Sequence, residues 1–325
     1  MRILSGIQPS GILHIGNYFG MMRPAIALQA EGEAFYFIAD YHALTSLQNP
    51  AALRENVRRV AIDFLACGLD PERAALFLQS DVPQVAELAW ILGTVTPMGL
   101  LERCHSYKDK TARGMQASAG LFTYPVLMAA DILIYDSDVV PVGKDQKQHL
   151  EVTRDIAVKM NETFGQDAAS GQIFKLPEPR INADTETVPG IDGQKMSKSY
   201  GNTIDIFGDE KETRKGVMSI VTDSSPVEAP KDPDSSTIFQ LYSLFAAKEE
   251  SEKMRDAFRL GGTGYGDFKK QLFAKLWEYF EPMRKRREEL LADPGYIDGV
   301  LERGARRANE IADQVMTRVR SAVGL

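Results

Sequence analysis

The alternation of short apolar runs with helical patterns in the first 165 residues is the feature that most constrains the fold. Residues 34–39 and 75–79 are apolar almost throughout, residues 3–7 carry Ile3, Leu4 and Ile7, and all three runs are short enough to be strands. Helical patterns follow two of these runs, at residues 14–30 and 51–66. Because apolar strands that alternate with helices are buried on both faces, the sequence predicts an α/β fold with a doubly wound parallel sheet.

The next segments continue this pattern and then lose it. Residues 83–136 have the pattern of helices, and a strand at 139–142 precedes a helix at 147–164. Residues 165–204 are rich in Pro, Gly, Asp and Thr and show no periodicity, which predicts one long loop. A loop of this length in a compact domain usually has a function or is disordered.

From residue 209 onward the pattern is helical, with breaks at 223–236 and 261–266. The change of pattern near residue 205 predicts a domain boundary there. We therefore expect a Rossmann-like α/β domain at residues 1–204 and a helical domain at residues 205–325.

Composition limits the class of protein. The chain of 325 residues is 44% apolar and 26% charged, which is ordinary for a globular protein. No apolar run approaches the roughly 20 residues of a membrane span, and no targeting segment precedes the first strand, so we expect a cytoplasmic protein without a membrane segment. The net charge of −7 argues against indiscriminate nucleic-acid binding but leaves room for a local basic surface. Two cysteines, Cys67 and Cys104, are too few for a disulfide framework or a four-cysteine structural zinc site.

The first strand ends in a turn that can bind an anion. Gln8-Pro9-Ser10-Gly11 leads into His14-Ile15-Gly16-Asn17 at a helix start, where free backbone N–H groups favour phosphate. Neither a Gly-x-Gly-x-x-Gly fingerprint nor a P-loop lysine is present. His14 and Asn17 share one helix face and can donate to a triphosphate, while Gly16 permits close approach of a base. The alternative is a capped helix with an incidental histidine.

A basic stretch, Lys195-Met196-Ser197-Lys198-Ser199, lies in the long loop between Gly193 and Gly201. Lys195 and Lys198 can approach the phosphates from the side opposite His14. The alternative is a solvated basic turn.

Asp131 interrupts the apolar helix predicted at residues 120–135. A carboxylate among apolar neighbours must be paired or hydrogen-bonded, unless it lies on an exposed helix face. Gln8, Asp40, His42 and Ser80 follow predicted strands, and ligands of parallel sheets bind beyond those strand ends.

The two motifs resemble the paired HIGH and KMSKS signatures of class I aminoacyl-tRNA synthetases, the first with Asn17 as its last residue. Residues 5–11, 128–133 and 140–149 narrow the resemblance to the tryptophanyl-tRNA synthetases. Tyrosyl-tRNA synthetases share the fold and the paired motifs and are the first rival. Another HIGH-type nucleotidyltransferase or a non-catalytic regulatory paralogue are further alternatives.

The resemblance implies that the enzyme activates L-tryptophan with ATP, releases pyrophosphate and transfers tryptophan to tRNA(Trp). Both reactants are anionic, so catalysis needs positioning and charge neutralisation and no protein nucleophile. His14, Asn17, Lys195 and Lys198 are the expected catalytic residues. Mg²⁺ is expected with ATP, held mainly by phosphate oxygens and water.

The resemblance also implies the ligand contacts. For ATP these are Gln8, Pro9, Ser10, Gly16, Asn17, Gly143, Lys144, Asp145, Val188, Lys195, Met196, Ser197, Lys198 and Ser199. Lys144 stands where a glutamate is more usual, and the Asp145 carboxylate can accept from ribose hydroxyls. For tryptophan, Asp131 would accept the indole N–H, Tyr124 and Gln146 would hold the ammonium, His42 the carboxylate, and Leu4, Met128, Val140 and Val142 would surround the ring. Core packing is an equal alternative for Met128 and the valines.

For the second half, the resemblance implies a helical domain that reads the anticodon, a symmetric homodimer, and a few C-terminal residues that return to the first domain. Some related enzymes carry an iron–sulfur cluster there, but no cysteine follows Cys104, so we expect no cluster. The charge run at residues 284–287 precedes two glutamates. A solvated face with ion pairs is slightly favoured there over phosphate contact.

Overall fold

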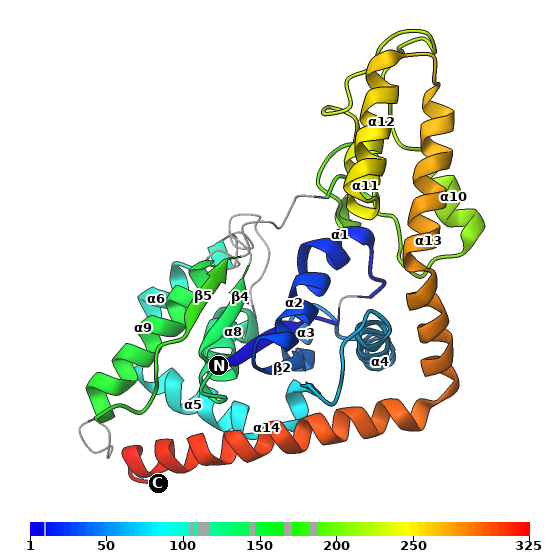
Figure 1. Cartoon of the computed structure of the whole chain (residues 1–325). Coiled ribbons are helices and arrows are strands. Elements are labelled where there is room, and N and C mark those ends of the chain that lie inside the picture. Colours follow the sequence, from blue (N-terminus) through cyan, green and yellow to red (C-terminus); the bar gives the residue numbers. More distant parts are fainter. Residues whose placement is uncertain (10, 105–106, 109–117, 143–146, 166–170, 182–187) are drawn as a thin grey trace.

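A five-stranded parallel sheet forms the centre of the molecule (Figure 1). The computed structural model describes the whole chain except residues 10, 105–106, 109–117, 143–146, 166–170 and 182–187. The strand order is β3-β2-β1-β4-β5. The strands are β1 (Arg2–Ile7), β2 (Glu33–Ile38), β3 (Ala74–Leu78), β4 (Val139–Val142) and β5 (Glu178–Ile181). Because the order reverses at β1, the sheet is doubly wound, and the predicted fold class is confirmed.

Alternate residues of each strand enter two separate apolar cores, as the period of a strand requires. In β2, Tyr36 and Ile38 pack into a core with α4 (Pro50–Ala66), while Phe35 and Phe37 pack on the opposite face. The opposite core contains α5 (Gln84–Val95), α8 (Ala119–Leu133), α9 (Lys147–Phe164) and α14 (Pro294–Val323). Helices therefore cover both faces of the sheet.

The helices of the first half connect these strands. After α3 (Asp40–Ala43) and α4 come η3 (Gln79–Asp81), α5 (Gln84–Val95), α6 (Met98–Glu102), α8 (Ala119–Leu133) and α9 (Lys147–Phe164). The helix expected at residues 14–30 is helical throughout but changes type along its length. It consists of α1 (Ile15–Asn17), a π-helical segment η1 (Tyr18–Met22), α2 (Arg23–Ala27) and a 3₁₀ segment η2 (Leu28–Ala30).

The long loop predicted at residues 165–204 contains a strand, so this prediction was wrong at residues 178–181. β5 is short and includes a proline and two charged residues, which gives no strand signal in the sequence. Pairing along β4, from Val139 opposite Glu178 to Val142 opposite Ile181, makes it an edge strand. A short 3₁₀ turn, η6 (Lys198–Tyr200), lies in the same segment.

The second half is helical. It comprises α10 (Glu210–Met218), α11 (Thr237–Phe245), α12 (Lys248–Leu260), α13 (Tyr265–Ala292) and α14 (Pro294–Val323). Figure 1 shows α11, α12 and the first part of α13 projecting away from the sheet, and α14 running back beneath it. None of the described helices is both long enough and apolar enough to cross a membrane.

The part of the chain that returns to the sheet is longer than the few residues that the family resemblance implied. The whole of α14, 30 residues, runs back to the first half and packs along β3, the outer strand of the sheet. Gly304 permits the approach, since a Cβ atom there would lie 2.0 Å from the backbone oxygen of Leu76. The Arg318–Asp136 and Arg320–Glu87 ion pairs hold the end of the helix. The exposed edge of β3 is thereby covered.

Candidate active site

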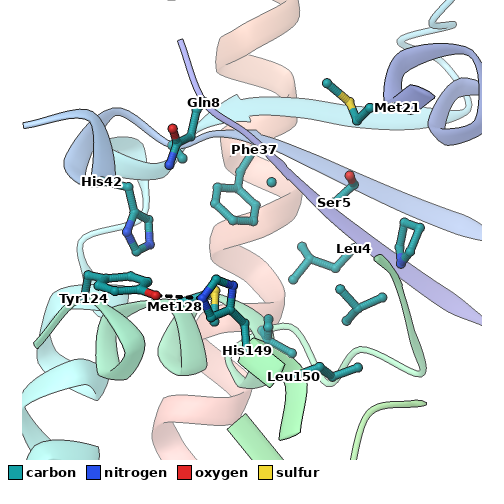
Figure 2. A pocket seen from close by; sticks show the side chains of 15 residues that line it. Leu4, Ser5, Gln8, Met21, Phe37, His42, Tyr124, Met128, His149 and Leu150 are labelled. Carbon is teal, nitrogen blue, oxygen red and sulfur yellow. Dashed lines mark hydrogen bonds between the residues drawn. The ribbon is translucent and has the colours of Figure 1, made fainter. Parts of the chain in front are cut away.

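A pocket of about 460 Å³ lies where β1, β2 and β4 meet α8 and α9 (Figure 2). Such a position, beside the reversal of strand order, is typical of ligand sites in doubly wound sheets. Its wall is mostly apolar with a few polar groups, as in sites for small organic ligands. The lining residues are Leu4, Ser5, Gly6, Gln8, Met21, Phe37, Ala39, His42, Tyr124, Met128, Ile132, Val140, Pro141, His149 and Leu150.

Asp131 is almost fully buried at 1% exposure, next to this pocket rather than in its wall. His42 Nε2 lies 2.9 Å from one carboxylate oxygen, and Gln79 Nε2 donates to both oxygens at 2.8 Å. Burial raises the pKa of Asp131, and the contacts with His42 and Gln79 oppose that rise. The wet helix face that the sequence left open as an alternative for Asp131 is therefore wrong.

Two aromatic residues complete the polar side of the pocket. The Tyr124 hydroxyl lies 2.7 Å from His149 Nε2, the dashed contact in Figure 2. The Tyr124 ring also meets the His42 ring edge-on, with centroids 6.3 Å apart. Tyr124 is thus fixed from both sides, with its polar end at the pocket.

The turn formed by residues 14–17, called here the HIGN turn, satisfies part of its own hydrogen bonding. His14 Nδ1 accepts from the Asn17 N–H at 3.3 Å, and Asn17 Oδ1 accepts from the His14 N–H at 3.4 Å. Burial, and then the charge of Lys198, lower the pKa of His14 to about 4. His14 is therefore a neutral cap at physiological pH, and the positive charge near this turn comes from Lys198.

The stretch at residues 195–199, called here the KMSKS stretch, packs against the HIGN turn through Met196. The Met196 sulfur accepts from the Gly16 N–H at 3.3 Å, and its side chain is buried. A Cβ atom on Gly16 would lie 3.0 Å from His14 Nδ1 and 3.2 Å from Met196 Cβ, so a larger residue would crowd this contact. Met196 N–H donates to the Val188 oxygen at 2.9 Å, which ties the start of the stretch to the preceding segment.

The lysines of the KMSKS stretch remain on the surface. Lys195 and Lys198 are exposed, and the Lys198 amine lies 3.8 Å from the Cβ position of Gly11 in the first turn. Partial burial lowers the pKa of Lys198, and nearby Asp205 raises it. Ser197 N–H donates to Asn202 Oδ1 at 2.8 Å, which holds the stretch from its far end. The two motifs therefore lie in direct contact through Met196, and Lys198 lies next to Gly11.

The other predicted ligand contacts differ in exposure, and some of them lie outside the described residues. Pro9 and Val188 are buried, whereas Gln8 and Ser199 are exposed. Of Val142 only the backbone is described, as the last residue of β4. The remaining predicted ligand contacts lie outside the described residues: Ser10, Gly143, Lys144, Asp145 and Gln146.

Sequence reasoning missed Gln79, His149, Phe37 and Ile132. Gln79 directly follows the apolar residues 75–78, which is the same signal that singled out Asp40 and His42. His149 stood in a quoted motif without a role. Nothing in the sequence distinguishes Phe37 and Ile132 from other core residues.

The charge run at residues 284–287 is divided between solvent and the protein. Lys285 and Arg286 form exposed ion pairs with Glu281 and Glu289, as the favoured interpretation predicts. By contrast, Arg287 Nε lies 2.6 Å from the buried Asp63 on α4. Arg284 stacks on Trp277, with 3.7 Å between the guanidinium carbon and the ring centroid. Two of the four cations therefore serve packing.

The fold, the pocket and the paired turns agree with a comparison to protein families. Residues 1–281 match the model described as tRNA synthetases class I (W and Y). The chain belongs to this family.

Within it, the chain groups with the tryptophan–tRNA ligases. It is 54% identical to the tryptophan–tRNA ligase of Fusobacterium nucleatum, over 100% of this chain and 98% of that protein. Identity to the Rhodopirellula baltica tryptophan–tRNA ligase is 55%, covering both chains completely. The crystal structure of tryptophanyl-tRNA synthetase from Campylobacter jejuni complexed with ADP and tryptophan superimposes with a TM-score of 0.93 at 49% identity, over 100% of both chains.

Proposed function

We propose that this protein is a tryptophan–tRNA ligase, which forms tryptophanyl-adenylate from L-tryptophan and ATP and then charges tRNA(Trp). One observation carries the proposal: an apolar pocket with a buried carboxylate at its side lies beside the joined HIGN turn and KMSKS stretch. Full-length identity to tryptophan–tRNA ligases supports the same activity.

The reaction is an in-line attack of the tryptophan carboxylate on the α-phosphorus of ATP, with pyrophosphate leaving. Because Nδ1 of the neutral His14 ring and Oδ1 of Asn17 accept hydrogen bonds within the turn, His14 Nε2–H and the Asn17 NH₂ group are the donors that bind the phosphates from one side in this proposal. Lys195 and Lys198 approach from the other side and neutralise charge as it moves onto pyrophosphate. His14 is neutral and holds the turn in shape, because its Nδ1 caps the backbone of Asn17.

Mg²⁺ accompanies ATP in this proposal and neutralises phosphate charge, held mainly by phosphate oxygens and water. Among the described residues, no group of three or more His, Cys, Asp or Glu side chains could hold a metal ion. Asp205, close to Lys198, is a carboxylate that a hydrated ion could meet through water.

For the amino acid, Asp131 accepts the indole N–H, a group that can only donate. Leu4, Met128 and Val140 enclose the ring, and Tyr124 and His42 lie at the polar end of the pocket. The contact with His149 fixes the Tyr124 hydroxyl, whose oxygen accepts from the ammonium in this proposal. Gln146 and Val142 complete the proposed set.

The partners and organisation follow the same proposal. The helical domain, at residues 205–325, reads the anticodon of tRNA(Trp), and the protein works in the cytoplasm. It forms a symmetric homodimer. Trp90 on α5 supports such an interface, because 78% of its surface is exposed, as is 63% of Met98. Exposed apolar side chains mark a protein interface when they form one contiguous patch.

Amino-acid-dependent exchange of pyrophosphate into ATP tests the activity. Exchange with tryptophan and none with tyrosine supports the proposal. Exchange with tyrosine alone would make the protein a tyrosine enzyme, and no exchange with any amino acid would favour a non-catalytic paralogue.

A further inference from the structure

Gln79 is the first residue of η3, directly beyond β3, and is 1% exposed. Its amide makes contacts in two directions. Nε2 donates to both oxygens of Asp131 at 2.8 Å. Oε1 accepts from the backbone N–H groups of Tyr41 at 3.1 Å and His42 at 3.4 Å. One side chain therefore joins the start of α3 to the middle of α8.

The backbone contacts fix which way the amide points. An N–H group can only donate, so the amide end that faces Tyr41 and His42 must be the oxygen. Rotating the amide by half a turn would place its NH₂ group against two backbone donors and its oxygen against a carboxylate. The NH₂ group must therefore point toward Asp131.

The contacts with Gln79 determine how many acceptor positions remain on Asp131. A carboxylate has about four lone-pair directions. His42 and Gln79 occupy three of them from within the protein. Burial favours the protonated acid, and the donors oppose it. An Asp131 that lost the Gln79 contacts would rotate or retain a proton, and a protonated carboxyl group is a weaker acceptor that presents an O–H donor of its own.

We propose that Gln79 is a specificity-determining positioning residue, which keeps Asp131 oriented as an acceptor for the indole N–H. This inference rests on the proposed tryptophan activity. Gln79 itself is not in the wall of the pocket, so it acts through Asp131.

The turn that carries Gln79 is held by contacts independent of its amide. The Ser80 N–H and hydroxyl both donate to Asp40, the backbone contact being 3.0 Å long. Asn309 on α14 donates to the Asp81 oxygen at 2.9 Å. Removing the Gln79 amide should therefore leave the turn in place, which makes the proposal testable by substitution.

The test compares two substrates in the exchange assay, tryptophan and the analogue whose indole is replaced by benzothiophene, so that sulfur stands in place of N–H. Gln79→Met keeps the length of the side chain and removes both amide groups. We expect kcat/KM for tryptophan to fall about 10- to 100-fold. For the sulfur analogue it should change less than about threefold, because that ligand has no donor for Asp131 to accept. KM for ATP should not change.

Two further variants control for structural damage. Ser80→Ala removes a contact to Asp40 in the same turn and leaves the contacts of Asp131 in place. It should change kcat/KM equally for tryptophan and for the sulfur analogue. Gln79→Glu keeps the oxygen that meets Tyr41 and His42 but exchanges the donor for a second carboxylate oxygen. For this variant kcat/KM for tryptophan should fall at least as far as for Gln79→Met. The value for the sulfur analogue should again change little.

The outcomes separate this inference from the proposed function. If Gln79→Met and Gln79→Glu lower kcat/KM equally for tryptophan and for the sulfur analogue, Gln79 has no role in selectivity. The same holds if neither value falls. In both cases the inference is wrong, while the tryptophan activity stands. If the unmodified protein shows no tryptophan-dependent exchange, the proposed function itself has failed.

Discussion

In the amino-acid pocket, Asp131, His42 and Gln79 are each 8% exposed or less and bond to one another across 37 to 89 positions of sequence. At the nucleotide edge, Lys195 and Lys198 are exposed, and the HIGN turn makes its capping bonds within three residues. The pocket is thus a pre-formed, desolvated network. The nucleotide edge is two local motifs joined mainly through Met196. We expect pocket residues to govern which amino acid binds, and edge residues to govern the rate.

The largest expected effect on activity comes from a substitution at the nucleotide edge. Lys198→Ala should lower kcat for activation by roughly 30- to 1,000-fold, because the lost cation contributes on the order of 2–4 kcal/mol in the transition state. Tryptophan binding, measured by calorimetry, should hardly change. Lys211→Ala, an exposed lysine at the start of α10, serves as the control. Wild-type kcat in Lys198→Ala would remove the KMSKS stretch from the proposed mechanism.

Asp131→Asn tests the pocket. An amide can turn its NH₂ group toward the indole donor, and an unmet buried donor costs about 1–3 kcal/mol. The expected result is a 10- to 100-fold fall in kcat/KM for tryptophan with unchanged KM for ATP, by the same arithmetic. If kcat/KM fell equally for tryptophan and for the sulfur analogue described above, Asp131 would support the fold rather than selectivity.

A smaller effect is expected far from both sites, at the contact of α14 with β3. Gly304→Ala would put Cβ 2.0 Å from the Leu76 oxygen, so the helix must move away from the strand. The free energy of unfolding, measured with denaturant, should fall by about 1–3 kcal/mol. Gly299→Ala is a matched control in the same helix, where Cβ would meet only the flexible end of Arg303 at 3.4 Å. That control should be neutral or slightly stabilising.

The smallest effect concerns pH. The pKa of His14 is lowered from 6.5 to about 4 in the folded protein, so between these values only the unfolded chain takes up the proton. His14 therefore makes the free energy of unfolding decrease as pH falls from about 6.5 to about 4. His14→Asn, which keeps a capping side chain, should remove on the order of 1–2 kcal/mol of this pH dependence, allowing for solvent screening. Parallel pH curves for the two proteins would contradict the assignment.

The strands and most helices could be predicted because their signals are local. Residues 34–39 and 75–79 are continuous apolar runs, and β2 and β3 lie there within one residue. The HIGN turn and the KMSKS stretch were found in the same way, as short runs. β5 was missed because its residues carry no strand preference, and its pairing with β4 supplies what the sequence lacks. The extent of the α14 contact was underestimated, since a helix pattern does not say which surface the helix covers.

The sequence by itself determined the parallel α/β arrangement and the two motifs, and it required a partner for Asp131 if that residue is buried. Burial of a carboxylate among apolar residues demands hydrogen bonds, whatever the fold. Only the tertiary structure decided which groups supply them. His42 and Gln79 reach Asp131 because the ends of β2 and β3 lie side by side in the sheet, next to α8. Hydrogen bonds between residues this far apart in sequence leave no periodicity, so the donors to Asp131 could be identified only in the folded chain.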